Sequence, residues 1–202
     1  MTAATTRIVL ASASSARAAL LTGAGLDFIR DPADIDEGKL KAKFTRQGLE
    51  ADNAALALAR AKAQAVSVRH AGGVVIGADQ ILDCGGVWFD KPADIEAARA
   101  HLRNLRGRSH RLVCAVAVLR DGAECWHHVE SARLTMRDFS DRFLENYLRG
   151  GGAEILESVG AYRLEGSGAQ LFSVVDGDYF TVLGLPLLPL LAFLREDGIL
   201  MT

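Results

Sequence analysis

The 202-residue chain contains only three cysteines, Cys84, Cys114 and Cys125, which lie far apart and form no CxxC motif. A disulfide framework needs an even number of cysteines at regular spacings, so this pattern excludes a disulfide-stapled secreted domain and favours a reducing compartment. We expect the protein to be cytoplasmic.

Long apolar runs are also missing. The most apolar stretch, 183–194, is interrupted by Pro186 and Pro189, and the first residues lack the charged and apolar regions of a signal peptide. The sequence therefore predicts neither a membrane span nor a membrane partner.

No excess of one charge is present, because 23 basic residues balance 25 acidic ones to a net charge of −2. Without a basic stripe, polymeric DNA or RNA is not an expected partner. The five histidines show no zinc-ligand spacing, which argues against a histidine metal centre.

Hydrophobic residues make up 50% of the chain, enough for a substantial core. Helical periodicity covers 52–68, an apolar strand covers 72–78, and hairpins are expected to turn at Gly85–Gly86 and at Asp121–Gly122. Further helices are expected to begin near Asp94, Ser140 and Pro186, with two short strands before the last of them, while 27–38 is expected to be an irregular polar loop. The pattern predicts a mixed α/β fold, and we place no domain boundary within 1–202.

The segment 8–21, IVLASASSARAALL, indicates a strand that enters a helix through a serine-rich turn. The first turn of a helix has unpaired N–H groups and attracts anions, and Ser12, Ser14 and Arg17 would add hydroxyls and a guanidinium for phosphate. The alternative is an ordinary strand–helix unit in which Ser14 or Ser15 is the N-cap.

Lys62 falls on the apolar stripe of the helix predicted over 52–68. An unpaired buried ammonium is costly, so this side chain either extends to water along its aliphatic stem or meets an anion inside a cleft.

Three further charged residues stand out. Asp79 follows the apolar run GVVIGA, which would place it at a strand end where α/β sheets bind ligands, and Lys91 would be its approximate cross-strand neighbour. A turn residue and a surface salt bridge are the plain alternatives. Glu37 ends an acidic segment, and a second carboxylate near Asp79 would suit magnesium, although a solvated loop acid is equally compatible with the pattern.

Taken in order, these segments resemble the Maf family of nucleoside-triphosphate pyrophosphatases over nearly the whole chain. The resemblance is carried by LASASSARAALL at 10–21, IDE at 35–37, LARAKA at 58–63, GADQ at 77–80, DKP at 90–92, RGRSH at 106–110, VGAYRLEG at 159–166 and VLGLPL at 182–187.

The resemblance implies a mixed, twisted sheet with flanking helices and two lobes around a deep cleft (Maf/ITPase-like), within one domain spanning 1–202. It also implies hydrolysis of a nucleotide to its monophosphate and pyrophosphate with a divalent metal, Mg²⁺ or Mn²⁺, and often a homodimer. The alternative is a nucleotide-binding regulator of cell division without turnover.

Site residues follow from the same resemblance. It brings into one site Ser12, Arg17, Glu37, Lys62, Asp79 and Lys91. Asp79 would be general base or metal ligand, Glu37 would hold the metal, and the cationic residues would contact the triphosphate. Ser14, at the helix N-terminus, would complete this phosphate site together with Ser12.

Base recognition is assigned to two more residues. Gln80 and Glu165 resemble the 7-methyl-GTP branch of the family rather than the thymidine/uridine branch, and they would read the base. Ala16 departs from that branch, which has a tryptophan there, and it also removes an arginine of the usual opening.

Overall fold

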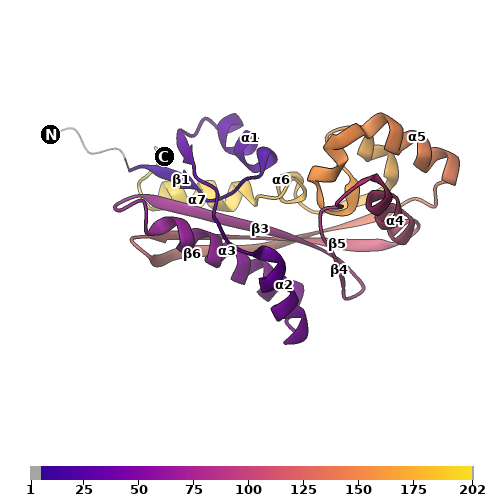
Figure 1. Cartoon of the computed structure of the whole chain (residues 1–202). Helices are drawn as coiled ribbons and strands as arrows, with labels where there is room; N and C mark the ends of the chain where they lie inside the picture. Colours follow the sequence, from indigo (N-terminus) through magenta and orange to yellow (C-terminus); the bar gives the residue numbers. More distant parts are fainter. Residues whose placement is uncertain (1–5, 202) are drawn as a thin grey trace. The chain divides into compact units, whose positions relative to one another are not determined.

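The computed structural model describes residues 6–201, which form a seven-stranded mixed sheet with flanking helices (Figure 1). The strands are β1 (Ile8–Leu10), β2 (Phe28–Arg30), β3 (Val74–Cys84), β4 (Val87–Phe89), β5 (Ser109–Arg120), β6 (Ala123–Met136) and β7 (Phe172–Asp176). The α-helices are α1 (Ser15–Gly23), α2 (Glu37–Arg46), α3 (Ala51–Ser67), α4 (Ile95–Leu105), α5 (Asp141–Gly151), α6 (Tyr179–Val182) and α7 (Leu187–Glu196). Three 3-10 helices, η1 (Gly152–Glu157), η2 (Val159–Ala161) and η3 (Ser167–Leu171), lie between α5 and β7.

The sheet has the strand order β2-β1-β3-β5-β6-β7, and β4 pairs with β3 off this path. Strand β1 runs parallel to both β2 and β3, and its pairing with β3 ends at Leu10↔Ile76. Strands β4 and β7 are antiparallel to their partners, so the sheet is mixed as predicted.

The chain divides into two compact units that are each built from separate stretches of sequence. Unit 1 comprises 1–79, 114–130 and 179–202, and unit 2 comprises 80–113 and 131–178. Strands β3, β5 and β6 each contribute residues to both units.

In unit 1, helices α1 and α7 cover one face of the strands and α3 lies on the other (Figure 1). Side chains alternate along a strand, so Ile76 and Ala78 of β3 face the core formed with α1 and α7. Val75, Gly77 and Asp79 must then face α3.

Gly77 determines how closely α3 approaches the sheet. A Cβ atom at this position would lie 2.1 Å from the carbonyl oxygen of Ala59 and 2.7 Å from the backbone nitrogen of Ala63. Only a residue without a side chain allows this contact between backbones, and it places the face of α3 that carries Lys62 against β3.

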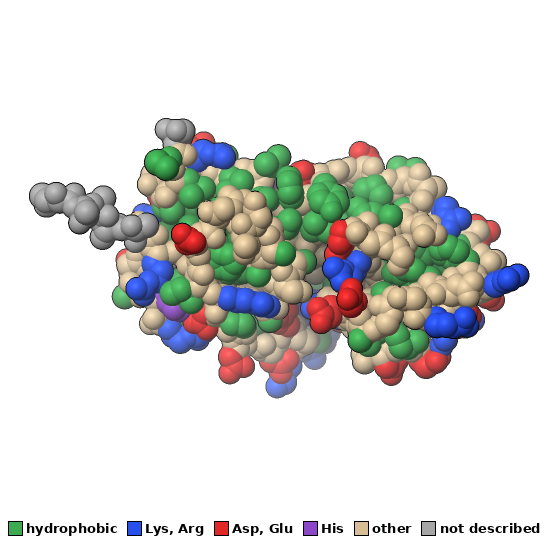
Figure 2. Space-filling model, turned by 90° about the horizontal axis from the view of Figure 1, so that it is seen from above, with side chains coloured by type: hydrophobic (Ala, Val, Ile, Leu, Met, Phe, Trp, Pro, Cys, Tyr) green, Lys and Arg blue, Asp and Glu red, His purple; other side chains and the backbone are tan. Residues whose placement is uncertain are grey.

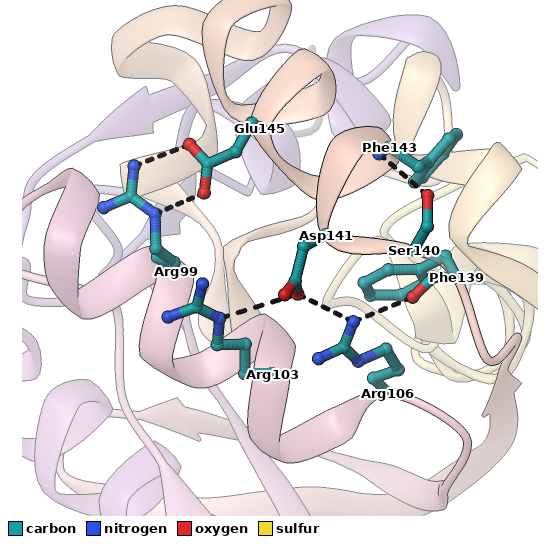
Figure 3. Close-up of polar contacts among 8 residues, drawn as sticks. All are labelled: Arg99, Arg103, Arg106, Phe139, Ser140, Asp141, Phe143 and Glu145. Atoms are coloured by element: carbon teal, nitrogen blue, oxygen red, sulfur yellow. Dashed lines mark hydrogen bonds and ion pairs between the residues drawn. The ribbon is translucent and has the colours of Figure 1, made fainter.

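In unit 2, ion pairs connect α4 to α5 (Figure 3). The Arg99 guanidinium donates to both carboxylate oxygens of Glu145, at 2.7 and 2.9 Å, and Arg106 donates to Asp141 and to the carbonyl of Phe139, each at 2.9 Å. Ser140 caps α5, because its hydroxyl accepts from the N–H of Phe143 at 3.2 Å.

Several elements are confirmed. The helix predicted over 52–68 is α3, Asp94 and Ser140 are the N-caps of α4 and α5, and both hairpins turn where predicted. The second turn has φ of 49° at Asp121 and 80° at Gly122.

Other expectations are wrong. The segment 27–38 is not an irregular loop, since it contains β2 and the start of α2 at Glu37. Strand β2 is too short to show a period and α2 buries no side chain, so neither left a hydrophobic pattern. Between α5 and the last helix there is one strand, β7, rather than two. The last helix itself begins where expected, since α7 starts at Leu187 and Pro186 is its N-cap.

The distribution of charged side chains on the surface and the apolar character of the helices can be compared with the sequence. On the face drawn in Figure 2, the basic side chains of the described residues are scattered among acidic and uncharged ones rather than gathered in a stripe. Within residues 6–201, no helix is long and apolar enough to cross a membrane.

Candidate functional site

The turn after β1 forms the first part of the site, in unit 1. Ser14 is the N-cap of α1, because its hydroxyl accepts from the backbone N–H of Arg17 at 3.3 Å. The Ser12 hydroxyl accepts from the N–H of Ser14 at 3.2 Å and from Nη1 of Arg17 at 3.1 Å. The cap interpretation of Ser14 is therefore correct, and the same turn places a hydroxyl beside a guanidinium at a helix N-terminus.

Arg17 itself is buried, at 8% exposure, and its Nε donates to the carbonyl of Gly184 at 2.7 Å. Gly184 has a φ of 100°, a conformation that favours glycine, and it directs this carbonyl at the guanidinium. A residue of the segment between α6 and α7 thus holds an arginine of α1 in place.

Lys62 of α3 occupies the centre of the second part. It is 6% exposed, and its Nζ lies 2.7 Å from Oδ1 of Asp79 and 2.8 Å from Oε2 of Glu37. Of the two alternatives for this lysine, extension to water is wrong, and the anion that it meets is the pair of carboxylates supplied by the chain itself.

The sequence predicted Asp79 at the end of a strand, but the structure places it inside β3. The reason is that β3 continues past its parallel partner: β1 ends opposite Ile76, and the antiparallel ladder with β4 starts at Leu82↔Phe89. Asp79 lies midway between these two ladders, beyond the carboxyl end of β1. The β3–β4 ladder is shorter than expected and includes neither Asp79 nor Lys91.

One oxygen of Asp79 has no partner. The residue is 3% exposed, Oδ1 accepts from Lys62, and Oδ2 is buried without a hydrogen bond. Buried carboxylate oxygens are normally satisfied, so this one is available to a group absent from the protein chain itself.

Glu37 is the first residue of α2, whose N-cap is Asp36. Burial raises the pKa of the Glu37 carboxyl, but the positive charge and hydrogen bond of Lys62 outweigh this effect, with smaller contributions from Lys41 and Arg17, so the pKa lies below its usual value. The carboxyl is held in the ionised form that binds cations.

Sequence reasoning missed Cys114 and Glu130. Burial raises the pKa of the Cys114 thiol to about 12, and Arg17, Asp79, Glu130 and Lys62 are all near enough to influence it. Cys114 is therefore a buried, inert thiol in the neighbourhood of these charged groups. It sits within the apolar run of β5, where nothing in the sequence distinguishes it from a core residue.

Glu130 of β6 accepts from the Thr181 hydroxyl at 3.0 Å and thereby ties α6 to the sheet of unit 1. Buried and exposed residues do not alternate regularly along β6, so the sequence pattern does not single out Glu130.

The remaining predicted residues belong to unit 2. Lys91 follows β4, and Gln80 follows Asp79 in β3, on the opposite face of the strand. Glu165 accepts from Nε of Arg163 at 2.8 Å, and Arg163 also pairs with Glu154. The structure thus brings Ser12 together with Arg17, and Glu37 together with Lys62 and Asp79, while the roles of Lys91, Gln80 and Glu165 stay predictions.

A divalent metal would find few protein ligands here. Among residues 6–201 no group of three or more histidine, cysteine, aspartate or glutamate side chains could hold a metal ion. Magnesium, however, commonly takes one or two carboxylates and completes its shell with water and substrate phosphates. The two carboxylates, one with an unsatisfied buried oxygen, fit that requirement.

Comparison with known proteins shows the family of the chain. The model of the Maf-like protein family matches residues 7–197, so the chain belongs to that family. A protein of Paramagnetospirillum magneticum called nucleoside triphosphate pyrophosphatase is 54% identical over 94% of this chain and 98% of its own length. A protein of Mesorhizobium japonicum called 7-methyl-GTP pyrophosphatase is 50% identical over 96% of this chain and 98% of its own length.

Among solved structures, a nucleoside-triphosphatase / dITP/XTP pyrophosphatase from Mycobacterium abscessus superposes with a TM-score of 0.46 at 17% identity. The match covers 97% of this chain and all of that one.

Proposed function

We propose that this protein hydrolyses a nucleoside triphosphate to the monophosphate and pyrophosphate. The observation that carries the proposal is the cluster in which the buried Lys62 and Asp79 meet the half-exposed Glu37, beyond the carboxyl end of β1, where the Ser12–Arg17 turn begins α1. Family membership and the names of the relatives support the same activity.

The proposed reaction is in-line attack of water on the α-phosphorus, with pyrophosphate as the leaving group. Charge that develops on the phosphate oxygens is stabilised by Arg17, Lys62 and Lys91, together with the N-terminal N–H groups of α1. Bound Mg²⁺ or Mn²⁺, held by Glu37 and Asp79, would neutralise phosphate charge and orient the attacking water.

Asp79 has two proposed roles, general base toward the water through its unpartnered Oδ2, or metal ligand. Replacing Asp79 with Asn should abolish pyrophosphate release, because an amide neither accepts the proton nor carries the charge that a metal needs. Measured Mn²⁺ affinity separates the roles: retained affinity with lost turnover identifies a base, and lost affinity identifies a ligand. The matched control is Asp34→Asn, an exposed aspartate of the same unit, and normal turnover by Asp79→Asn would contradict both roles.

For the substrate we propose 7-methyl-GTP, with Gln80 and Glu165 reading the base. A carboxylate at 165 can accept from the N–H groups of a guanine, and Arg163 holds that carboxylate in place. The Mesorhizobium relative carries this substrate in its name, while the Paramagnetospirillum relative has the general name.

A panel of canonical and 7-methylated nucleoside triphosphates, assayed for pyrophosphate with and without Mg²⁺ or Mn²⁺, tests activity and substrate together. We expect metal-dependent release that is fastest with 7-methyl-GTP. Faster release from dTTP or UTP would contradict the substrate assignment, and stoichiometric binding without any product would favour the regulator without turnover.

A further inference from the structure

Lys62 lies between two carboxylates, those of Glu37 and Asp79. Its ammonium lies within 2.8 Å of both Glu37 and Asp79, and the aliphatic stem is buried against the sheet. The Asp79 carboxylate is buried and that of Glu37 is half-exposed, and two carboxylates that converge on one point repel each other unless a positive charge lies between them. In the structure that charge is an ammonium.

Three cations therefore compete for two carboxylates: the ammonium, a divalent metal and a proton. The charge-assisted hydrogen bonds of Lys62 are strong, and a metal that coordinates the same oxygens must replace them. Oδ2 of Asp79, buried and without a partner, is the oxygen at which a metal can begin to bind while Lys62 still holds Oδ1.

We propose that Lys62 is an internal counterion that divalent metal displaces, so that its ammonium is released from the two carboxylates as the metal enters. This inference rests on Glu37 and Asp79 as the proposed metal ligands. Lys62 then weakens metal binding in the nucleotide-free protein and becomes available to the phosphates once metal is bound.

The direct test is Mn²⁺ binding to the nucleotide-free protein, followed by the electron paramagnetic resonance signal of free Mn²⁺. Lys62→Gln should bind Mn²⁺ about tenfold or more tightly than wild type, since the metal no longer has to replace a charge-assisted hydrogen bond. Lys62→Arg keeps the positive charge and should bind no more tightly than wild type.

Lys39→Gln is the matched control. Lys39 lies on α2, is exposed and pairs with Asp36 at 2.8 Å, so its removal deletes the same charge outside the cluster and should leave Mn²⁺ affinity unchanged. Equal or weaker binding by Lys62→Gln, equal tightening by Lys62→Arg, or no Mn²⁺ binding by any form overturns the proposal.

A measurement on the unmodified sequence covers the case in which Lys62→Gln does not fold. In NMR spectra of protein labelled at the lysine ε-carbons, the Lys62 signal, identified by its absence in Lys62→Arg, should shift on titration with Mg²⁺ while that of Lys39 stays constant. An unmoved Lys62 signal at saturating Mg²⁺ overturns the exchange.

Pyrophosphate release measured on the same preparations separates this inference from the proposed function. If the protein releases pyrophosphate but Lys62→Gln does not bind Mn²⁺ more tightly, only the proposed exchange of cations is wrong. If Lys62→Gln binds Mn²⁺ more tightly but no nucleotide is hydrolysed, only the proposed reaction is wrong.

Discussion

His110 shows how burial of a single residue makes the stability of this protein depend on pH. The residue is 2% exposed, its Nε2 lies 2.7 Å from the Tyr162 hydroxyl, and burial lowers the pKa of the imidazole from 6.5 to about 4. Nδ1 is buried without a partner, so the charged form has no compensating acceptor.

The direction of the pH effect follows from the lowered pKa. Between pH 6.5 and pH 4 the imidazole of the unfolded chain is protonated while that of the native state stays neutral. The contribution of His110 to the free energy of unfolding is therefore complete above pH 6.5 and is lost as the pH falls toward 4. By linkage, the loss amounts to about 3 kcal/mol.

We expect the free energy of unfolding, measured with urea, to fall less steeply in His110→Gln than in wild type as the pH is lowered from 6.5 to 4. Glutamine can keep a hydrogen bond to Tyr162 but does not titrate. His127→Gln, which replaces an exposed histidine, serves as the control and should keep the wild-type slope; an unchanged slope in His110→Gln would show that another group dominates.

At the scale of elements, the contact between α3 and β3 decides whether the charged cluster forms at all. Helix α3 places Lys62 on its sheet-facing side together with Ala59 and Ala63, and β3 places Asp79 two residues beyond Gly77 on the same face. The backbones approach because position 77 has no side chain.

Gly77→Ala should destabilise the protein by about 3 kcal/mol or more, at or above the upper end for overpacking, because the new methyl group meets rigid backbone rather than a flexible side chain. It should also lower pyrophosphatase activity, since displacement of α3 moves Lys62 away from its proposed position on the triphosphate. Thermal unfolding and the pyrophosphate assay measure the two effects.

The control for this substitution is Gly150→Ala, where an added Cβ would have nothing within 4 Å. This variant should be about as stable as wild type. Wild-type stability in Gly77→Ala would mean that α3 can move away from β3 at little cost.

At the scale of the whole molecule, the two units share their longest strands. Residues of β3, β5 and β6 belong to both, so three continuous strands run from one unit into the other. We expect the units to unfold in one cooperative transition.

The two tryptophans allow this expectation to be measured, because Trp88 lies in unit 2 and Trp126 in unit 1. In Trp88→Phe the fluorescence reports unit 1, and in Trp126→Phe it reports unit 2. Within each variant the midpoint of urea unfolding by fluorescence should coincide with that by far-ultraviolet circular dichroism. Separated midpoints would show that one unit unfolds before the other.

Local chemistry made much of this molecule predictable from the sequence. Some features depend only on residues close in sequence, and the sequence therefore predicted them. They are the helix caps at Ser14, Asp94 and Ser140, the turn at Asp121–Gly122 and the apolar stripe of α3. The position of Lys62 on that stripe was visible for the same reason.

What only the tertiary structure decided is which groups meet. Nothing local shows that the anion facing Lys62 is supplied by Glu37 and Asp79, or that β3 continues past Asp79, because both depend on how closely elements far apart in sequence pack. Propensity and periodicity describe a chain's neighbours along the sequence, whereas the charge cluster arises from backbone contact between α3 and β3 that the absence of one side chain permits.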